Sequence, residues 1–240
     1  MADLNQTIHP SGFAVNAGRR NKAMKIVQIL REHTNGQKRL ALLDIGTGNG
    51  EIAKYLSKLY NVVSVDIVDQ RVVQDGFKFV QVNGEELPFA DQSFDVVVSN
   101  HVIEHMANAD KHLSETGRVL KDGGIVYLAT PNKLWPWEAH NKIYLLHYLP
   151  AATFNHLLKR MEKYREDIYL LTWWTLNQKM KKTYSVHIVS DRICKWPLKY
   201  HMQCSTFLAK ILSFVPLQVY RMFTFINPTL AVVLKKRTST

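Results

Sequence analysis

Residues 39–67 read RLALLDIGTGNGEIAKYLSKLYNVVSVDI, and this stretch decides the fold. It opens with a short apolar run over 39–45 that ends at glycines, a pattern typical of a strand buried on both faces. Residues 51–59 have helical periodicity, and a second apolar run follows over 62–67. This order predicts a parallel β-α-β unit whose glycines lie at the carboxyl end of the first strand.

The same alternation continues on both sides of this unit. Further apolar runs predict strands at residues 77–82, 94–99, 125–130 and 228–236. Helical periodicity predicts helices at residues 18–33 and 110–120. We therefore expect a doubly wound α/β fold, a mostly parallel sheet with helices on both faces, in which ligands bind beyond the carboxyl ends of the strands.

The glycine loop after the first strand suits a small ligand. Gly46, Gly48 and Gly50 stand at every second position, and glycine lets a ligand approach the backbone closely. The dinucleotide fingerprint G-x-G-x-x-G would need a glycine where Glu51 stands, so a pyrophosphate is disfavoured. Asp44 adds an acceptor for an ammonium or hydroxyl group, and a ligand with a cationic amino acid moiety fits this loop better than a phosphate.

Acidic and amide residues follow the next two predicted strands. Asp66 ends the second strand, where such folds place a carboxylate against the ribose hydroxyls of a nucleoside. Asn83, Gly84 and Glu85 follow the third strand. Alone, each would be an ordinary strand-end or loop residue, but their order along the sheet favours one ligand site.

The motifs together carry a family resemblance. LLDIGTGNG, VVSVDI, NGEELPFADQSFDVVVSN, HVIEHM and GGIVYLATPN resemble the class I S-adenosylmethionine (SAM)-dependent methyltransferases, in particular the ubiquinone and menaquinone biosynthesis branch. The resemblance covers about residues 18–132. It implies a seven-stranded Rossmann-like sheet with an antiparallel last strand, and SAM as the cofactor.

The resemblance also implies where the cofactor binds. The loop of Gly46, Gly48 and Gly50 would pass under the methionine moiety with Asp44 nearby, and Asp66, followed by Ile67, would hold the ribose. Asn83 and Gly84, followed by Glu85, would flank the adenine. Many relatives have Asp where Asn83 stands, so its adenine contact would run through an amide. Asn100 would lie near the methionine end and the transferred methyl.

The histidines of HVIEH, residues 101–105, admit two interpretations. H-x-x-E-H also spells an inverted zinc-protease motif, but it directly follows the fourth predicted strand and no third ligand is signposted, so we expect no metal. Transfer of a methyl to a hydroxyl or amine requires removal of a proton, which suits a histidine. His105 or His101 is therefore a candidate general base, and the alternative is that Glu104 and His105 only shape the loop around the cofactor.

The acceptor is expected to be a small molecule. The sequence lacks both the Asn-Pro-Pro-aromatic motif of amino methylation of bases and the Pro-Cys nucleophile of cytosine methylation. We expect an apolar or anionic acceptor methylated at oxygen, whereas carbon and nitrogen remain alternatives. At 240 residues with 46% hydrophobic content, the chain suits one domain, with a cofactor-binding core over 18–132, a substrate lid over 133–182 and a sheet-completing segment over 183–240.

Positive charge is concentrated in the second half of the chain. The net charge is +11; the first 130 residues carry 14 basic and 15 acidic side chains, and the rest carry 17 and 5. A basic amphipathic surface for anionic lipid is one interpretation, and a merely solvated face is the one we favour. The surface would comprise Trp196, the apolar run 207–219 and the basic residues Lys179, Lys181, Lys182, Arg192, Lys195, Lys199 and Lys210.

Partners and location follow from what accompanies this charge. No RNA-binding motif is present, so a nucleic-acid partner is not expected, and nothing specifies an oligomeric state. Cys194 and Cys204 match no disulfide framework, and no signal peptide or membrane span is evident, so we expect a cytoplasmic protein. The rival hypothesis is a methyltransferase-like binding module that acts through its basic, Trp-rich surface on membrane or nucleic acid. An oxidoreductase is discounted by the glycine spacing.

Overall fold

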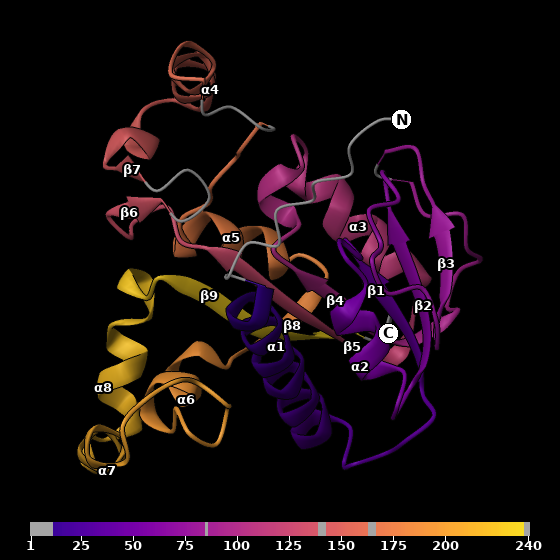
Figure 1. Ribbon diagram of the computed structural model, residues 1–240, viewed down its shortest axis with the longest axis horizontal. Helices are drawn as coiled ribbons and strands as arrows, with labels where there is room; N and C mark the ends of the chain where they lie inside the picture. Colours follow the sequence, from indigo (N-terminus) through magenta and orange to yellow (C-terminus); the bar gives the residue numbers. More distant parts are fainter. Residues whose placement is uncertain (1–11, 85, 139–142, 163–166, 238–240) are drawn as a thin grey trace, which may run out of the picture.

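The computed structural model describes residues 12–84, 86–138, 143–162 and 167–237. Its centre is a seven-stranded sheet in the order β3-β2-β1-β4-β5-β9-β8 (Figure 1). Neighbouring strands from β3 to β5 are parallel, and β9 is antiparallel to both β5 and β8. The strands are β1 (Ala41–Ile45), β2 (Asn61–Asp66), β3 (Lys78–Gln81), β4 (Phe94–Asn100), β5 (Leu120–Pro131), β8 (Tyr184–Ile188) and β9 (Thr229–Lys236). The predicted doubly wound sheet with an antiparallel last strand is confirmed.

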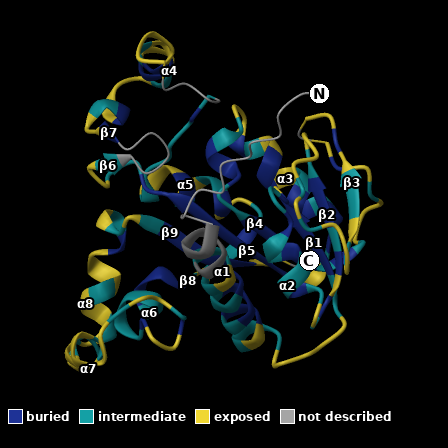
Figure 2. Cartoon of the chain, in the orientation of Figure 1, coloured by how far each residue is buried: buried dark blue, intermediate teal, exposed yellow. Residues whose placement is uncertain are grey.

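Helices cover both faces of the sheet. One face packs against α1 (Gly12–His33), α2 (Glu51–Leu56) and α6 (Ser190–Lys195), and the other packs against α3 (Ala109–Val119) and α5 (Trp173–Met180). Side chains alternate along each strand, so Val96 and Val98 join the first layer while Val97 joins the second. Figure 2 shows the strands buried between these layers. Burial on both faces explains why the strands are continuous apolar runs.

Two predicted elements differ in extent. β5 begins at Leu120, five residues before the predicted strand, because Leu120 pairs with Phe94 and a register shift then brings Ile125 opposite Val96. α2 ends at Leu56, and the next residues turn directly into β2. HVIEH forms only the short 3₁₀ helix η1 (Ile103–His105), so its two histidines are not on consecutive turns of an α-helix.

The predicted lid range, 133–182, does not pack as one unit. It contains the hairpin of β6 (Trp137–Glu138) and β7 (Ile143–Tyr144), η2 (Leu146–Tyr148), α4 (Ala151–Arg160) and α5. α4 packs with β7 in a small separate core that includes Ile143, Phe154 and Leu158. α5 instead inserts Leu176 and Met180 into the main core beside the sheet. The division into core, lid and sheet-completing segment stays a prediction.

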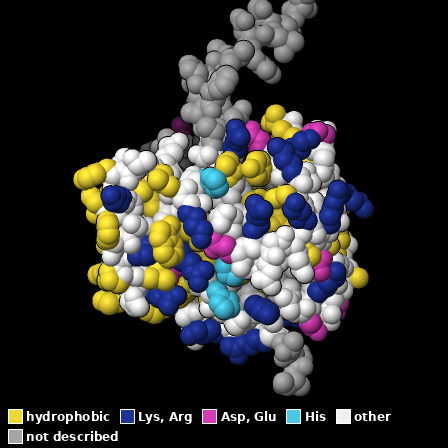
Figure 3. Space-filling model, turned by 90° about the horizontal axis from the view of Figure 1, so that it is seen from below, with side chains coloured by type: hydrophobic (Ala, Val, Ile, Leu, Met, Phe, Trp, Pro, Cys, Tyr) yellow, Lys and Arg dark blue, Asp and Glu magenta, His cyan; other side chains and the backbone are white. Residues whose placement is uncertain are grey.

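The segment between α6 and β9 lies largely on the surface. It contains α7 (Thr206–Phe214), α8 (Leu217–Met222) and η3 (Thr224–Ile226), and neither α7 nor α8 has a buried residue. Figure 3 shows hydrophobic side chains gathered on the side of the molecule where these helices lie, with Lys and Arg among them. Within the described residues, no helix is both long enough and apolar enough to cross a bilayer.

Candidate functional site

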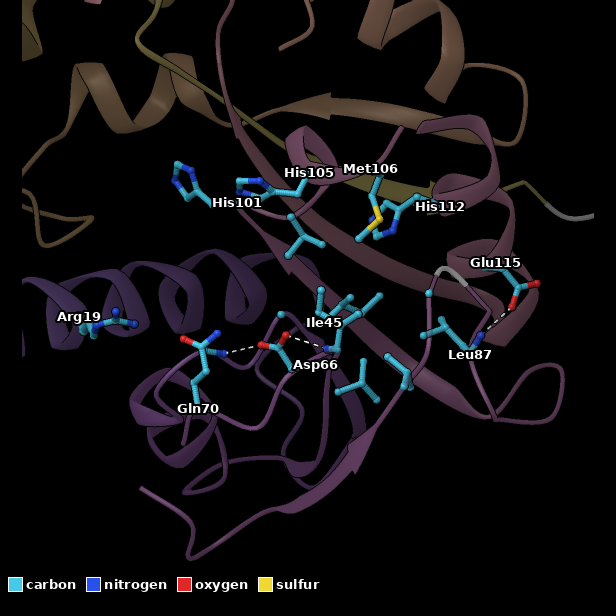
Figure 4. Close-up of a pocket in the computed structure, with 17 residues that line it drawn as sticks. Arg19, Ile45, Asp66, Gln70, Leu87, His101, His105, Met106, His112 and Glu115 are labelled. Carbon is cyan, nitrogen blue, oxygen red and sulfur yellow. Dashed lines mark hydrogen bonds between the residues drawn. The ribbon is translucent and has the colours of Figure 1, made fainter. Parts of the chain in front are cut away.

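A cavity of about 390 Å³ opens at the carboxyl ends of β1, β2 and β4 (Figure 4). This is the edge of the sheet where the sequence places its candidate residues. Those that line the cavity are Gly46, Gly48, Asp66, Ile67, Gly84, His101 and His105. Ile45, Val65, Val82, Leu87, Val102 and Met106 add an apolar wall. The cavity therefore combines an apolar lining with a carboxylate and imidazoles.

The loop after β1 requires glycine at two positions for different reasons. Gly46 has φ +80°, its N–H donates to the Val65 carbonyl (2.9 Å), and a Cβ there would lie 2.5 Å from Cγ2 of Val102. Gly50 has φ +85°, and a Cβ there would overlap the carbonyl oxygen of Val73. Gly46 thus keeps the floor of the cavity open. Gly50 does not line the cavity, and the absence of a side chain there lets the backbone at Val73 pack closely against it.

Asp66 ties the glycine loop to the end of β2. One carboxylate oxygen accepts the Gly48 N–H and the other accepts the Ile67 N–H, both at 2.8 Å. A carboxylate has about four acceptor positions, so each oxygen keeps capacity for a second donor. Because Asp66 lines the cavity, that capacity is available to a pair of vicinal hydroxyl groups on a ligand.

Asp44 lies behind the loop and does not line the cavity. It is buried, and its Oδ2 accepts a hydrogen bond from the Ser64 hydroxyl (2.8 Å). Burial, assisted by the nearby negative charge of Asp66, raises the pKa of Asp44 to about 7 despite the Ser64 hydrogen bond. An Asp44 carboxyl in this place supports β1 and β2, and its predicted contact with an ammonium group stays a prediction.

Two further predicted cofactor residues, Asn83 and Asn100, adjoin cavity residues in the chain without lining the cavity themselves. Asn83 is exposed beside Gly84, and Asn100 ends β4 opposite Ala129. Glu85 lies outside the described residues. Their predicted contacts with adenine and with the methionine end stay predictions.

His101 and Glu104 form a fixed pair at the cavity. His101 has a positive φ of 60°, which is rare for a non-glycine residue, and its backbone N–H donates to the Ala129 carbonyl (2.8 Å). Its Nδ1 lies 3.2 Å from Oε1 of Glu104, and the other Glu104 oxygen accepts from the Thr130 hydroxyl (2.9 Å). Burial raises the pKa of Glu104, but the hydrogen bond and charge of His101 outweigh it, so the net pKa is lowered. Glu104 is therefore an ionised, buried acceptor that orients the His101 ring.

His112 is a cavity residue that the sequence did not indicate. It projects from α3, is buried, and its Nε2 lies 3.0 Å from the Ser99 hydroxyl. Burial lowers the pKa of His112 to about 4, so the imidazole is neutral near pH 7. A lone histidine on the apolar face of a helix was the available signal, and it does not distinguish a core residue from a site residue.

The loop after β3 is held by an ion-pair network from α3. Glu115 accepts the Leu87 N–H (3.1 Å) and pairs with Arg118 (2.8 Å), which lowers the pKa of Glu115 to about 2. Arg118 also donates to the carbonyls of Leu87 and Phe89. Figure 4 shows Glu115 and Leu87 closing one end of the cavity. The Leu-Pro-Phe segment is therefore a positioned wall rather than a reactive group.

Comparison with known families identifies the region that builds this cavity. Residues 43–128 match the model described as a methyltransferase domain, and they contain the glycine loop, Asp66 and the His101–Glu104 pair. The chain carries a methyltransferase domain. The predicted relation to the methyltransferases is confirmed for this region, and it implies SAM as the cofactor.

Relatives of the methyltransferase domain include enzymes of quinone biosynthesis. The ubiquinone biosynthesis O-methyltransferase of Brucella anthropi is 29% identical over 130 residues, which cover 49% of this chain and 52% of that protein. The demethylmenaquinone methyltransferase of Porphyromonas gingivalis is 30% identical over 151 residues, which cover 55% and 58%. The chain thus spans about half the length of the relatives it matches.

Solved structures show how widely this fold is used. A SAM-dependent methyltransferase from Mesorhizobium loti superposes with a TM-score of 0.58 at 15% identity, covering 87% of this chain and 96% of that one. The [4+2]-cyclase SpnF superposes with a TM-score of 0.56 at 16% identity, covering 90% and 82%. These likenesses establish the fold, and function has to be argued from the cavity.

Proposed function

We propose that the chain is a SAM-dependent methyltransferase that acts on the oxygen of a small, apolar or anionic acceptor. The observation that carries the proposal is one cavity that holds both the Asp66-tied glycine loop and, from the next strand, the His101–Glu104 pair. The glycine loop with Asp66 suits a nucleoside with an amino acid tail, and the His101–Glu104 pair suits removal of a proton. Asp66 would accept from the ribose hydroxyls, and Ile67, Val82 and Leu87 would pack on the adenine.

Bound SAM supplies a methyl group on a sulfonium centre, which is a strong electrophile. His101 lines the cavity, and Glu104 orients its ring through Nδ1, so the His101 imidazole is the group placed to take the acceptor's hydroxyl proton. The bound SAM would supply its methyl carbon to that oxygen, and the electrons of the broken C–S bond would stay on sulfur. Glu104 stabilises the imidazolium that results, and the neutral His112 adds no competing charge to the cavity. His105 also lines the cavity and is the alternative base.

The small-molecule class of the acceptor has support from the relatives, whose names refer to ubiquinone biosynthesis and to demethylmenaquinone. The apolar wall of Val102 and Met106 is compatible with an aromatic or lipid-like acceptor. Methylation at a hydroxyl oxygen uses the proton acceptor, and an O-methyltransferase is what the name of the Brucella anthropi relative specifies. The cytoplasmic location stays a prediction; Cys194 and Cys204 are free thiols, as a reducing compartment would keep them.

The first test is isothermal titration of the purified chain with SAM, S-adenosylhomocysteine, NAD and ATP. Selective binding of the two adenosyl compounds is expected. Methyl transfer to phenols or quinone precursors is then measured, and comparison of His101→Ala with His105→Ala shows which histidine is the base. Unchanged turnover in both variants would remove the acid–base role. Absence of adenosyl binding by the folded protein would instead favour a methyltransferase-like binding module.

A further inference from the structure

The α7–α8 segment, residues 206–226, leaves many of its apolar side chains exposed to solvent. Phe207 is 76% exposed and Phe214 77% exposed, at opposite ends of α7. Met222 on α8 is 69% exposed, and further exposed apolar side chains are Leu208, Ile211, Val219, Phe223 and Ile226. A helix that contributes no residue to the core gains nothing in folding from such side chains, so they indicate a partner surface.

Polar contacts at its base fix the segment in place. Lys195 on α6 donates to the carbonyls of Ser213 (2.7 Å) and Val215, which end α7. Arg221 on α8 donates to the fully buried carboxylate of Asp191 (2.9 Å). The two helices are thus anchored to α6 on one side, and much of α7 and α8 is coloured as exposed in Figure 2.

Charge decides what kind of partner fits. Residues 192–226 contain no Asp or Glu and five Lys or Arg, and Lys210 is exposed on α7 itself. The nearby acids are already compensated, because Asp191 pairs with Arg221 and Glu32 pairs with Lys199 (2.8 Å). The surface is therefore apolar and positively charged, as Figure 3 shows on that side of the molecule. A second copy would bring two such surfaces together and is opposed by their like charge.

We propose that the α7–α8 segment docks the protein on the headgroup region of an anionic phospholipid membrane. Phe207, Phe214 and Met222 enter the boundary between headgroups and acyl chains, and Lys210 contacts lipid phosphates. Exposed aromatic and aliphatic side chains on short helices, flanked by Lys and Arg, are the composition of interfacial helices. The docking surface lies outside the cavity and does not depend on the reaction catalysed there.

Vesicle co-sedimentation tests this docking surface. The full chain is mixed with vesicles of phosphatidylglycerol and phosphatidylcholine, or of phosphatidylcholine alone, at low and high salt. The double variant F207S/F214S and the variant K210E are compared with matched controls, V72S and K38E. Val72 is 81% exposed in the loop before β3, and Lys38 is exposed before β1, both away from the segment.

Binding is expected only with the anionic vesicles, and it should weaken with salt. F207S/F214S should weaken it by about tenfold or more and K210E by about threefold, whereas V72S and K38E bind as wild type. All five proteins should show the same circular dichroism and thermal unfolding, because none of the replaced side chains is buried.

Three results would overturn the proposal. These are absence of binding to anionic vesicles, equal loss in the control variants, and wild-type self-association in sedimentation velocity that F207S/F214S abolishes. SAM binding is titrated with the same preparations as an independent measurement. A protein that does not bind SAM can still bind vesicles, and a protein that does not bind vesicles can still bind SAM.

Discussion

Replacement of Asp66 by Asn is expected to weaken binding of S-adenosylhomocysteine by about 10- to 100-fold. The change keeps the size of the side chain and removes its charge. In the wild type both carboxylate oxygens accept a backbone N–H at 2.8 Å, from Gly48 and from Ile67. An amide has only one oxygen, so one of these N–H groups would face an NH₂ group instead of an acceptor.

The magnitude follows from these contacts. A hydrogen bond to a charged group contributes about 1.5–3 kcal/mol, which corresponds to the expected loss in affinity when ribose hydroxyls bind the same carboxylate. The free protein is affected too, because the tie between the glycine loop and β2 is weakened. We expect the free energy of unfolding to fall by about 1–2 kcal/mol.

Isothermal titration measures the affinity, and urea unfolding measures the stability. Asp69→Asn is the matched control, since Asp69 is exposed three residues away, pairs with Arg71 and does not line the cavity. If Asp66→Asn bound S-adenosylhomocysteine within about twofold of wild type, or if Asp69→Asn lost as much, the reasoning from the carboxylate contacts would be refuted.

Three further predictions concern the loop, the buried acid and the base. Gly50→Ala should lower the free energy of unfolding by about 3 kcal/mol, because the added Cβ would overlap the Val73 carbonyl. Gly84→Ala should lower it by about 1 kcal/mol, because Gly84 has φ +99° but no neighbour within 4 Å of an added Cβ. Urea unfolding of the two variants measures the difference. Folding raises the pKa of Asp44 from 3.8 to about 7, so its carboxyl favours the folded state below pH 4 and loses that contribution as the pH rises through 7. Asp44→Asn should therefore gain stability relative to wild type over this range in unfolding at several pH values; a constant difference would contradict it. Glu104→Gln should reduce kcat for a hydroxyl acceptor by about 10- to 100-fold with little change in KM, and an unchanged kcat would show that Glu104 does not support the base.

Most of the fold was predictable because each strand of the parallel part is buried on both faces. Burial on both faces makes strands such as β4 continuous apolar runs, and glycines or acids mark their ends. The beginning of β5 was missed because Asp122, Gly123 and Gly124 read as a turn before Ile125. In the structure these residues lie within the strand, at its register shift against β4.

The candidate site was predictable where it follows strand ends and unpredictable where it depends on tertiary contacts. Gly46, Gly48 and Asp66 belong to the first kind. Side chains alternate along β1, so Asp44 shares the face of Leu42 while Ile45 lines the cavity, and the predicted place of Asp44 near the ligand stays a prediction. His112 and Glu115, the two cavity residues of α3, could not be predicted from the sequence, because only the packing of α3 brings them to the loops after β3 and β4.

The position of β9 in the sheet has a consequence for biosynthesis. The inner edge of β5 pairs with β4, but its other edge pairs only with β9, which joins Pro131 to Thr229 across almost a hundred residues of chain. At about 5–20 residues per second, translation needs roughly 5–20 s to cover that distance. During this interval the edge of β5 that pairs with β9 is without its native partner. The nascent chain is thus a natural client for a chaperone, and a stalled ribosome between these two strands would release an aggregation-prone product.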